Sequence, residues 1–163
     1  MIIINKSGYL KYKKLKFRCA FGKAGIGKKK EEGDNITPRG VYQITKIFYR
    51  KDRIKNITTK FRLNEIKKNM GWCDDSRSKN YNQLIKLPSK FSHENLFRKD
   101  SLYDLILVLN YNMRPITKNK GSAIFIHIAQ NNYERTAGCV AIKKNNLIKL
   151  LSKINKKVKI KIN

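Results

Sequence analysis

Short runs of apolar and β-branched residues, separated by a few polar residues or glycines, recur along most of the chain. Runs of this length between turn-forming residues are typical of strands. They predict strands over Ile2–Ile4, Tyr9–Tyr12, Leu15–Ala20, Val41–Tyr49, Leu102–Leu109, Ser122–Ala129, Cys139–Ile142 and Val158–Ile162. The pattern therefore predicts a mainly β protein.

Two segments have the spacing of helices instead. Between Lys144 and Ile154, the apolar residues fall on one face of a helix. A second, shorter helix is expected over Ser92–Asp100, with Leu96 and Phe97 facing the core. Residues 51–90 have the weakest periodicity, so we expect long loops there.

The length of 163 residues suits one compact domain, because a chain of this size buries enough apolar surface to fold without disulfides or structural metal ions. No internal repeat, linker or low-complexity tract divides it, so we expect a single domain over residues 1–163. No apolar run approaches the roughly 18 residues of a spanning helix, and the apolar run at Ile2–Ile4 is too short for a signal peptide. The sequence thus predicts no membrane segment and shows no export signal.

The charge balance is unusual, with 38 Lys and Arg against 11 Asp and Glu and a formal net charge of +27. Such a surface attracts polyanions, including nucleic acid, anionic membranes and carboxylate-rich polymers. The alternative is compositional drift, because Lys, Asn and Ile together supply 67 of the 163 residues. We take drift as the working interpretation and expect no nucleic-acid partner, since nucleic-acid binders more often use Arg and interleaved aromatics.

Three cysteines, Cys19, Cys73 and Cys139, have no metal-ligand spacing, and their odd number leaves at least one thiol free. One predicted strand ends near His127, a polar loop follows, and the next strand begins at Cys139. If these strands are antiparallel neighbours, the imidazole lies within hydrogen-bond reach of the thiol and can activate it. Gly138 would let the backbone amides approach an oxyanion. Packing is the alternative role for such a pair, and we expect it for Cys19 and Cys73.

A series of short motifs extends this pattern over the chain. They are Gly25-Ile26-Gly27, Glu32-Gly33-Asp34, Thr37-Pro38-Arg39-Gly40-Val41-Tyr42, Gly71-Trp72-Cys73-Asp74-Asp75, Tyr81-Asn82, Leu102-Tyr103-Asp104-Leu105, Tyr111-Asn112 and the closing block from His127 to Cys139. In their order and coverage, the chain resembles the L,D-transpeptidase family, the YkuD-type catalytic domain of bacterial cell-wall enzymes, and particularly its short, single-domain proteobacterial branch.

The resemblance implies a mainly β domain, a β-sandwich or curved mixed sheet with one or two short helices. It also implies that Cys139 is the nucleophile, that His127 is its base, and that Thr136 and Gly138 shape the nucleophile loop. Cys139 would form a thioester with a peptidoglycan stem peptide and pass the acyl group to an amine of another stem, usually a diaminopimelate side chain. No metal or cofactor is implied, and we expect a monomer.

The chain departs from the commonest family pattern at two positions around the nucleophile. Ala137 stands where the family has a second His, and Ala141 stands where it has Arg or Asn. The interval from His127 to Cys139 is also shorter than usual. These departures leave the donor bond and the acceptor open, including an unusual 1,3 or 3,3 crosslink.

Five residues outside the nucleophile loop are candidates for substrate binding, namely Arg39, Trp72, Asp74, Asp75 and Tyr81. The paired carboxylates could hold an ammonium group through charge-assisted hydrogen bonds, and an Arg could hold a carboxylate. The alternative is structural, with the aspartates in a turn and cap and the aromatic residues in the core or a wall.

The sequence leaves two other functions open. With water in place of the amine, the same thioester would make the protein a wall carboxypeptidase, endopeptidase or amidase. In a different class, a non-catalytic basic protein would bind polyanions through its lysines. The inferred substrate predicts a periplasmic or cell-wall location, whereas the lack of a visible export signal leaves a cytoplasmic role on precursors or recycled muropeptides open.

Overall fold

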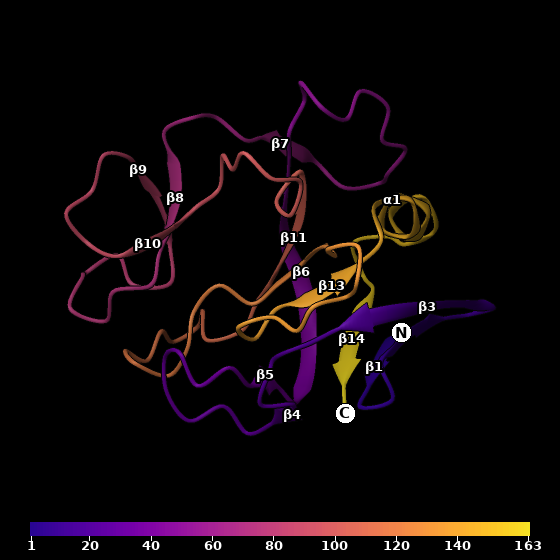
Figure 1. Ribbon diagram of the computed structural model, residues 1–163, viewed down its shortest axis with the longest axis horizontal. Coiled ribbons are helices and arrows are strands. Elements are labelled where there is room, and N and C mark those ends of the chain that lie inside the picture. The colour runs from indigo at the N-terminus through magenta and orange to yellow at the C-terminus, as the bar shows by residue number, and fades with distance from the viewer.

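The computed structural model describes residues 1–163, and most of its regular structure is strand (Figure 1). The strands are β1 (Ile2–Asn5), β2 (Tyr9–Tyr12), β3 (Leu15–Ala20), β4 (Ile26–Gly27), β5 (Thr37–Pro38), β6 (Gly40–Tyr49), β7 (Leu63–Glu65), β8 (Met70–Cys73), β9 (Leu84–Lys86), β10 (His93–Asn95), β11 (Leu105–Leu109), β12 (Phe125–Ile128), β13 (Val140–Ile142) and β14 (Lys159–Ile162). The one helix is α1 (Lys144–Lys153). The mainly β fold with a curved mixed sheet is confirmed.

The largest sheet has nine strands in the order β11-β12-β13-β3-β2-β1-β14-β6-β7. The long strand β6 also pairs with β11, so the sheet closes on itself. Neighbours are parallel at β1–β14, β12–β13 and β6–β7 and antiparallel elsewhere in this sheet. The closed sheet encloses the main core and leaves few free strand edges.

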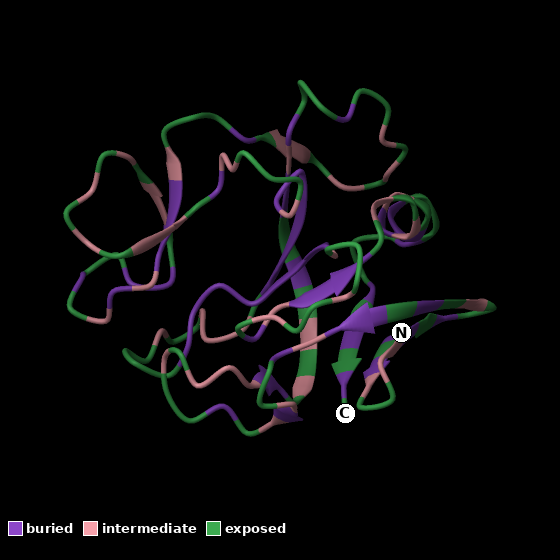
Figure 2. Ribbon diagram, in the orientation of Figure 1, coloured by how far each residue is buried: buried purple, intermediate pink, exposed green.

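Alternation along the strands fills this core. In β1, Ile2 and Ile4 are buried and the intervening Ile3 is exposed, as the pleat of a strand requires. The strands and α1 together form a core cluster of 25 buried residues, in which the helix contributes Leu147 among others. Figure 2 shows the buried residues along the central strands and the exposed ones mostly in the outer loops.

A second layer lies on the side of the molecule away from α1 (Figure 1). Here β8 pairs with β9 and β10 in a three-stranded antiparallel sheet. A smaller core cluster includes Trp72 of β8, Val108 of β11 and Phe125 of β12, so it joins this layer to the main sheet. Cys139 packs against the same cluster, which places the predicted nucleophile beside both layers.

The predicted helix over Ser92–Asp100 is wrong. Residues His93–Asn95 form β10 instead, with Glu94 opposite Trp72 of β8. The Asn95 side chain then accepts a hydrogen bond from the Phe97 amide, a local turn that competes with helix formation. Pairing with β8 therefore overrides the helical spacing of the apolar residues, although Leu96 is fully buried as predicted.

Candidate active site

The two strands that carry the predicted nucleophile and base are neighbours, and they are parallel. His127 of β12 lies opposite Ala141 of β13. The expected antiparallel pairing is therefore wrong, because residues 129–139 cross over and return the chain in the same direction. Since side chains alternate along a strand, Cys139, two residues before Ala141, faces the same side as His127. In this orientation Cys139 Sγ accepts a hydrogen bond from the Phe125 amide at 3.3 Å.

His127 and Cys139 line one cavity of about 150 Å³. Its other lining residues are Glu94, Leu102, Tyr103, Gln130, Glu134, Arg135, Thr136, Ala137 and Ala141. Two larger grooves, of about 840 and 790 Å³, lie near β6 and β8 and include neither His127 nor Cys139. We assign the site to the smaller cavity because, of these cavities, it is the one lined by both a thiol and an imidazole.

The thiol of Cys139 is held by backbone groups. Its Sγ–H donates to the Ala123 carbonyl at 3.0 Å, and Sγ accepts from the Phe125 amide. Burial raises the pKa of Cys139 to about 12, with a further increase from the nearby Glu94 carboxylate, while the Phe125 amide acts in the opposite direction. The thiol is therefore protonated at neutral pH, and the structure has no direct hydrogen bond from it to His127.

The imidazole of His127 is only 6% exposed. Its Nδ1 lies 2.9 Å from the Ile128 carbonyl oxygen, and because a carbonyl can only accept, Nδ1 carries the proton and Nε2 is the basic nitrogen. Burial lowers the pKa of His127 to about 4, although the bond to Ile128 partly opposes this. The ring of Tyr103 meets the imidazole edge to face, with centroids 5.4 Å apart. The imidazole is thus neutral and held in one orientation.

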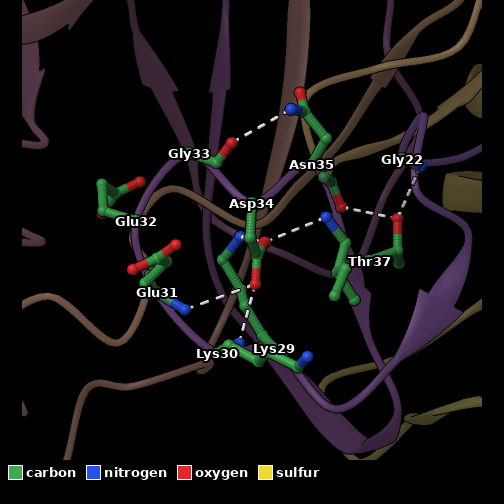
Figure 3. Close-up of polar contacts among 12 residues, drawn as sticks. Gly22, Lys29, Lys30, Glu31, Glu32, Gly33, Asp34, Asn35 and Thr37 are labelled. Atoms are coloured by element: carbon green, nitrogen blue, oxygen red, sulfur yellow. Dashed lines mark hydrogen bonds and ion pairs between the residues drawn. The ribbon is translucent and has the colours of Figure 1, made fainter.

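Two threonines hold the loop that carries Cys139, the predicted nucleophile. Thr136 Oγ1 accepts from the Gly138 amide at 3.1 Å and donates to the Cys139 carbonyl at 2.5 Å. Thr37, which is fully buried, donates from Oγ1 to the Gly138 carbonyl at 2.7 Å and accepts from the Gly22 amide at 2.8 Å (Figure 3). Gly138 has a φ of +139°, and a Cβ there would lie 3.0 Å from the Ile36 carbonyl oxygen. Glycine is therefore required for this close approach.

The loop before β5 is organised around Asp34 (Figure 3). Its carboxylate accepts from the amides of Lys30, Glu31 and Ile36 and pairs with the buried Lys29 ammonium at 2.5 Å. Burial alone would raise the pKa of Asp34, but the bonds from Lys29 and the amides lower it to about 2. The loop therefore forms a stable support for Thr37 and, through it, for the nucleophile loop.

A family model for the L,D-transpeptidase catalytic domain, YkuD, matches residues 1–162. The chain belongs to this family. Membership confirms the resemblance seen in the sequence and connects the chain to peptidoglycan-related activity. No curated protein matches the chain, and none of its helices has the length and apolar character needed to cross a membrane.

The structure places the other candidate site residues in three kinds of surroundings. Thr136 and Gly138 lie at the nucleophile, as described above. Trp72 and Tyr81 are buried in the core, where the Trp72 indole donates to Asn82 and the Tyr81 hydroxyl donates to Glu32. Arg39 is exposed and is not among the residues that line the cavity.

The two aspartates of the L,D-transpeptidase-like motif have different surroundings. Asp75 binds Arg77 through both carboxylate oxygens, and these bonds hold the pKa of Asp75 well below its usual range. The carboxylate of Asp75 is therefore already paired with a neighbouring side chain. Asp74, in contrast, has a buried Oδ1 with no hydrogen-bond partner.

Sequence reasoning missed three residues at this site. Glu94 and Tyr103 line the cavity, and Thr37 holds the nucleophile loop. Tyr103 stands in one of the motifs that carried the resemblance, but nothing in the sequence indicated that its ring packs on His127. The position of Glu94 depends on the pairing of β10 with β8, which the expected helix concealed.

Proposed function

We propose that this protein is a peptidoglycan L,D-transpeptidase in which Cys139 is the nucleophile and His127 is the general base. The observation that carries the proposal is the shared cavity, in which a protonated thiol and a neutral imidazole face the same side of β12 and β13. A neutral imidazole can accept a proton, and a thiol becomes a strong nucleophile when it loses one. Family membership supports the same class of chemistry.

In the first step, Cys139 Sγ attacks a stem-peptide carbonyl carbon while its proton moves to His127 Nε2. The tetrahedral intermediate then expels an amine, which takes the proton from Nε2 as the C–N bond breaks. A thioester on Cys139 and a free amino compound result. Because burial disfavours both the thiolate and the imidazolium, the proton transfer has to accompany the attack rather than precede it.

In the second step, an amine of another stem attacks the thioester carbonyl carbon. Its proton moves through His127 to Cys139 Sγ as the C–S bond breaks, which regenerates the thiol and leaves a new amide crosslink. The hydrogen bonds of Thr37 and Thr136 support this proposal, because they fix the peptide groups on either side of Gly138 beside the reacting carbon.

The size and charge of the site agree with a peptide substrate. A cavity of about 150 Å³ is smaller than a typical whole-ligand pocket, so it suits the reacting end of a longer chain. The net charge of +27 attracts carboxylate-rich wall peptides whether it arose by drift or by selection. Peptidoglycan lies outside the cytoplasmic membrane, and we propose that the protein acts there as a monomer.

The test is intact-mass spectrometry of the protein incubated with disaccharide tetrapeptide and pentapeptide muropeptides. We expect an acyl adduct on the wild type and on Cys19→Ala, no adduct on Cys139→Ala, and dimeric muropeptides as products. Fragmentation of the dimers identifies the joined residues. An adduct that yields only shortened monomers would show a hydrolase. If a folded wild type gives neither adduct nor product, the cell-wall function is wrong and binding of polyanions becomes the next function to test.

A further inference from the structure

Glu94 lies in the candidate active site on an element that the catalytic scheme above does not use. It is the central residue of β10 and pairs with Trp72 of β8. Opposite residues in an antiparallel pair share a face, so Glu94 and Trp72 face the same side, and Asp74 follows directly after β8. Glu94 lines the cavity together with Cys139 and His127.

The carboxylate of Glu94 has no cationic partner. None of the ion pairs in the structure includes it. Its one side-chain hydrogen bond comes from the Tyr103 hydroxyl at 3.1 Å. The guanidinium of Arg98 stacks over the Tyr103 ring and binds Asp100 instead, and that of Arg135, which also lines the cavity, donates to the Lys23 carbonyl. A partly buried carboxylate is rarely left without a counter-charge, least of all in a protein with 38 basic residues.

Two further observations indicate that a cation is what this position lacks. Burial raises the pKa of Glu94 and the charge of Asp74 raises it further, while the Tyr103 hydrogen bond and the charge of Arg98 act in the opposite direction without cancelling the increase. Asp74 is also the residue whose buried Oδ1 has no partner. A donor with several N–H groups bound at Glu94 would supply the missing counter-charge. Glu134, the other acidic residue of the cavity, is exposed, so water can solvate its carboxylate and no counter-charge is needed.

The geometry points to Glu94 as the residue that binds the ammonium group of the acceptor amine, an inference that rests on the proposed transpeptidase function. The acceptor reaches the site as an ammonium ion and has to lose a proton before it can attack. Glu94 takes that first proton and releases it to solvent. His127 takes the second proton as the C–N bond forms, and passes it to Cys139 Sγ as the C–S bond breaks.

A competing role for Glu94 is indirect. It binds the Tyr103 hydroxyl, and the Tyr103 ring packs against His127, so Glu94 could act by orienting the base. That role would affect both half-reactions, because His127 serves in both. An acceptor-binding role affects only the second half-reaction, and only for acceptors that carry a charge.

The experiment measures the two half-reactions separately in wild type, Glu94→Gln, Tyr103→Phe and the control Glu65→Gln, an exposed residue of β7. Acylation of Cys139 by a disaccharide tetrapeptide is followed by intact mass. Decay of the thioester is then followed with two acceptors, free diaminopimelate as the ammonium-bearing amine and methoxyamine, which is uncharged at neutral pH.

We expect Glu94→Gln to acylate no more slowly than the wild type, because loss of the carboxylate also removes a charge that raises the pKa of Cys139, and to react with methoxyamine at least as fast. Its aminolysis by diaminopimelate falls about 10- to 100-fold, the range for loss of a hydrogen bond to a charged group. Tyr103→Phe keeps the carboxylate and changes the preference between acceptors less. Glu65→Gln behaves as the wild type.

Two results would overturn the assignment of Glu94 alone. In one, acylation slows as much as aminolysis. In the other, both acceptors slow equally and Tyr103→Phe reproduces the effect, so that Glu94 acts through His127. A wild type that forms no adduct on Cys139 overturns the proposed function and the role of Glu94 with it.

Discussion

Replacing Thr37 with valine removes one hydroxyl group and keeps the shape of the side chain. In the structure that hydroxyl accepts from the Gly22 amide at 2.8 Å and donates to the Gly138 carbonyl at 2.7 Å. Thr37, Gly22 and Gly138 are all buried, so water cannot replace the lost bonds. A buried donor or acceptor without a partner costs about 1–3 kcal/mol. With two such groups, we expect Thr37→Val to lower the free energy of unfolding by about 2–5 kcal/mol.

Urea unfolding followed by the fluorescence of Trp72, the single tryptophan, measures this loss. The control is Thr58→Val at an exposed threonine, which we expect to change stability by less than about 0.5 kcal/mol. Because Gly138 precedes the nucleophile, we also expect slower acylation of Cys139 in Thr37→Val. If Thr37→Val unfolds like the control, the two hydrogen bonds do not hold the nucleophile loop and the reasoning is refuted.

Burial lowers the pKa of His127 from 6.5 in the unfolded chain to about 4 in the folded protein. As the pH falls below 6.5, the unfolded chain therefore takes up a proton that the folded protein does not, and the free energy of unfolding decreases until the pH reaches about 4. The loss is about 3 kcal/mol at most, and urea titrations of wild type and His127→Gln across this range measure it. Gly138→Ala places a Cβ 3.0 Å from the Ile36 carbonyl oxygen at a φ of +139°, so we expect a loss of about 1–3 kcal/mol in thermal unfolding and little acylation. Asp34→Asn leaves the buried Lys29 ammonium without its ion pair, and we expect urea unfolding to show a loss of about 2–4 kcal/mol.

Each of these expectations has an outcome that contradicts it. A constant stability difference between wild type and His127→Gln at both ends of the pH range would mean that the imidazole is not neutral and buried in the fold. Gly138→Ala with wild-type unfolding would show that the nucleophile loop can move away from Ile36. Unchanged stability in Asp34→Asn would show that Lys29 reaches solvent.

Alternation of apolar and polar residues was enough to find most of the large sheet. Ile2–Ile4, Tyr9–Tyr12 and Leu15–Ala20 coincide with strands, because one face of each is buried and the other is exposed. The same rule failed over Ser92–Asp100, where only long-range pairing with β8 decides the conformation. The short strands β7, β8 and β9 within residues 51–90 show little periodicity for the same reason.

The site was predictable only where a residue type itself indicated the chemistry. Cys139 and His127 could be paired from the sequence because two predicted strands carry them on either side of one loop and because the motifs along the chain resemble those of the L,D-transpeptidase family. Their relative direction could not, because a polar loop is compatible with either a hairpin or a crossover. Thr37 and Glu94 contribute through partners far away in the sequence, at Gly138 and Tyr103, and no local pattern indicates such contacts.

The place of β14 between β1 and β6 has a consequence for synthesis of the protein on the ribosome. The hairpin of β1 and β2 is translated well before β14, so the edge of β1 that pairs with β14 has no neighbour until β14 has been made. During most of elongation the nascent chain therefore exposes unpaired backbone groups along an isoleucine-rich strand, which is a binding site for chaperones and a hazard for aggregation. We therefore expect folding of this protein to be completed only after translation of β14, and its yield in cells to depend on protection of that edge as well as on the stability of the finished fold.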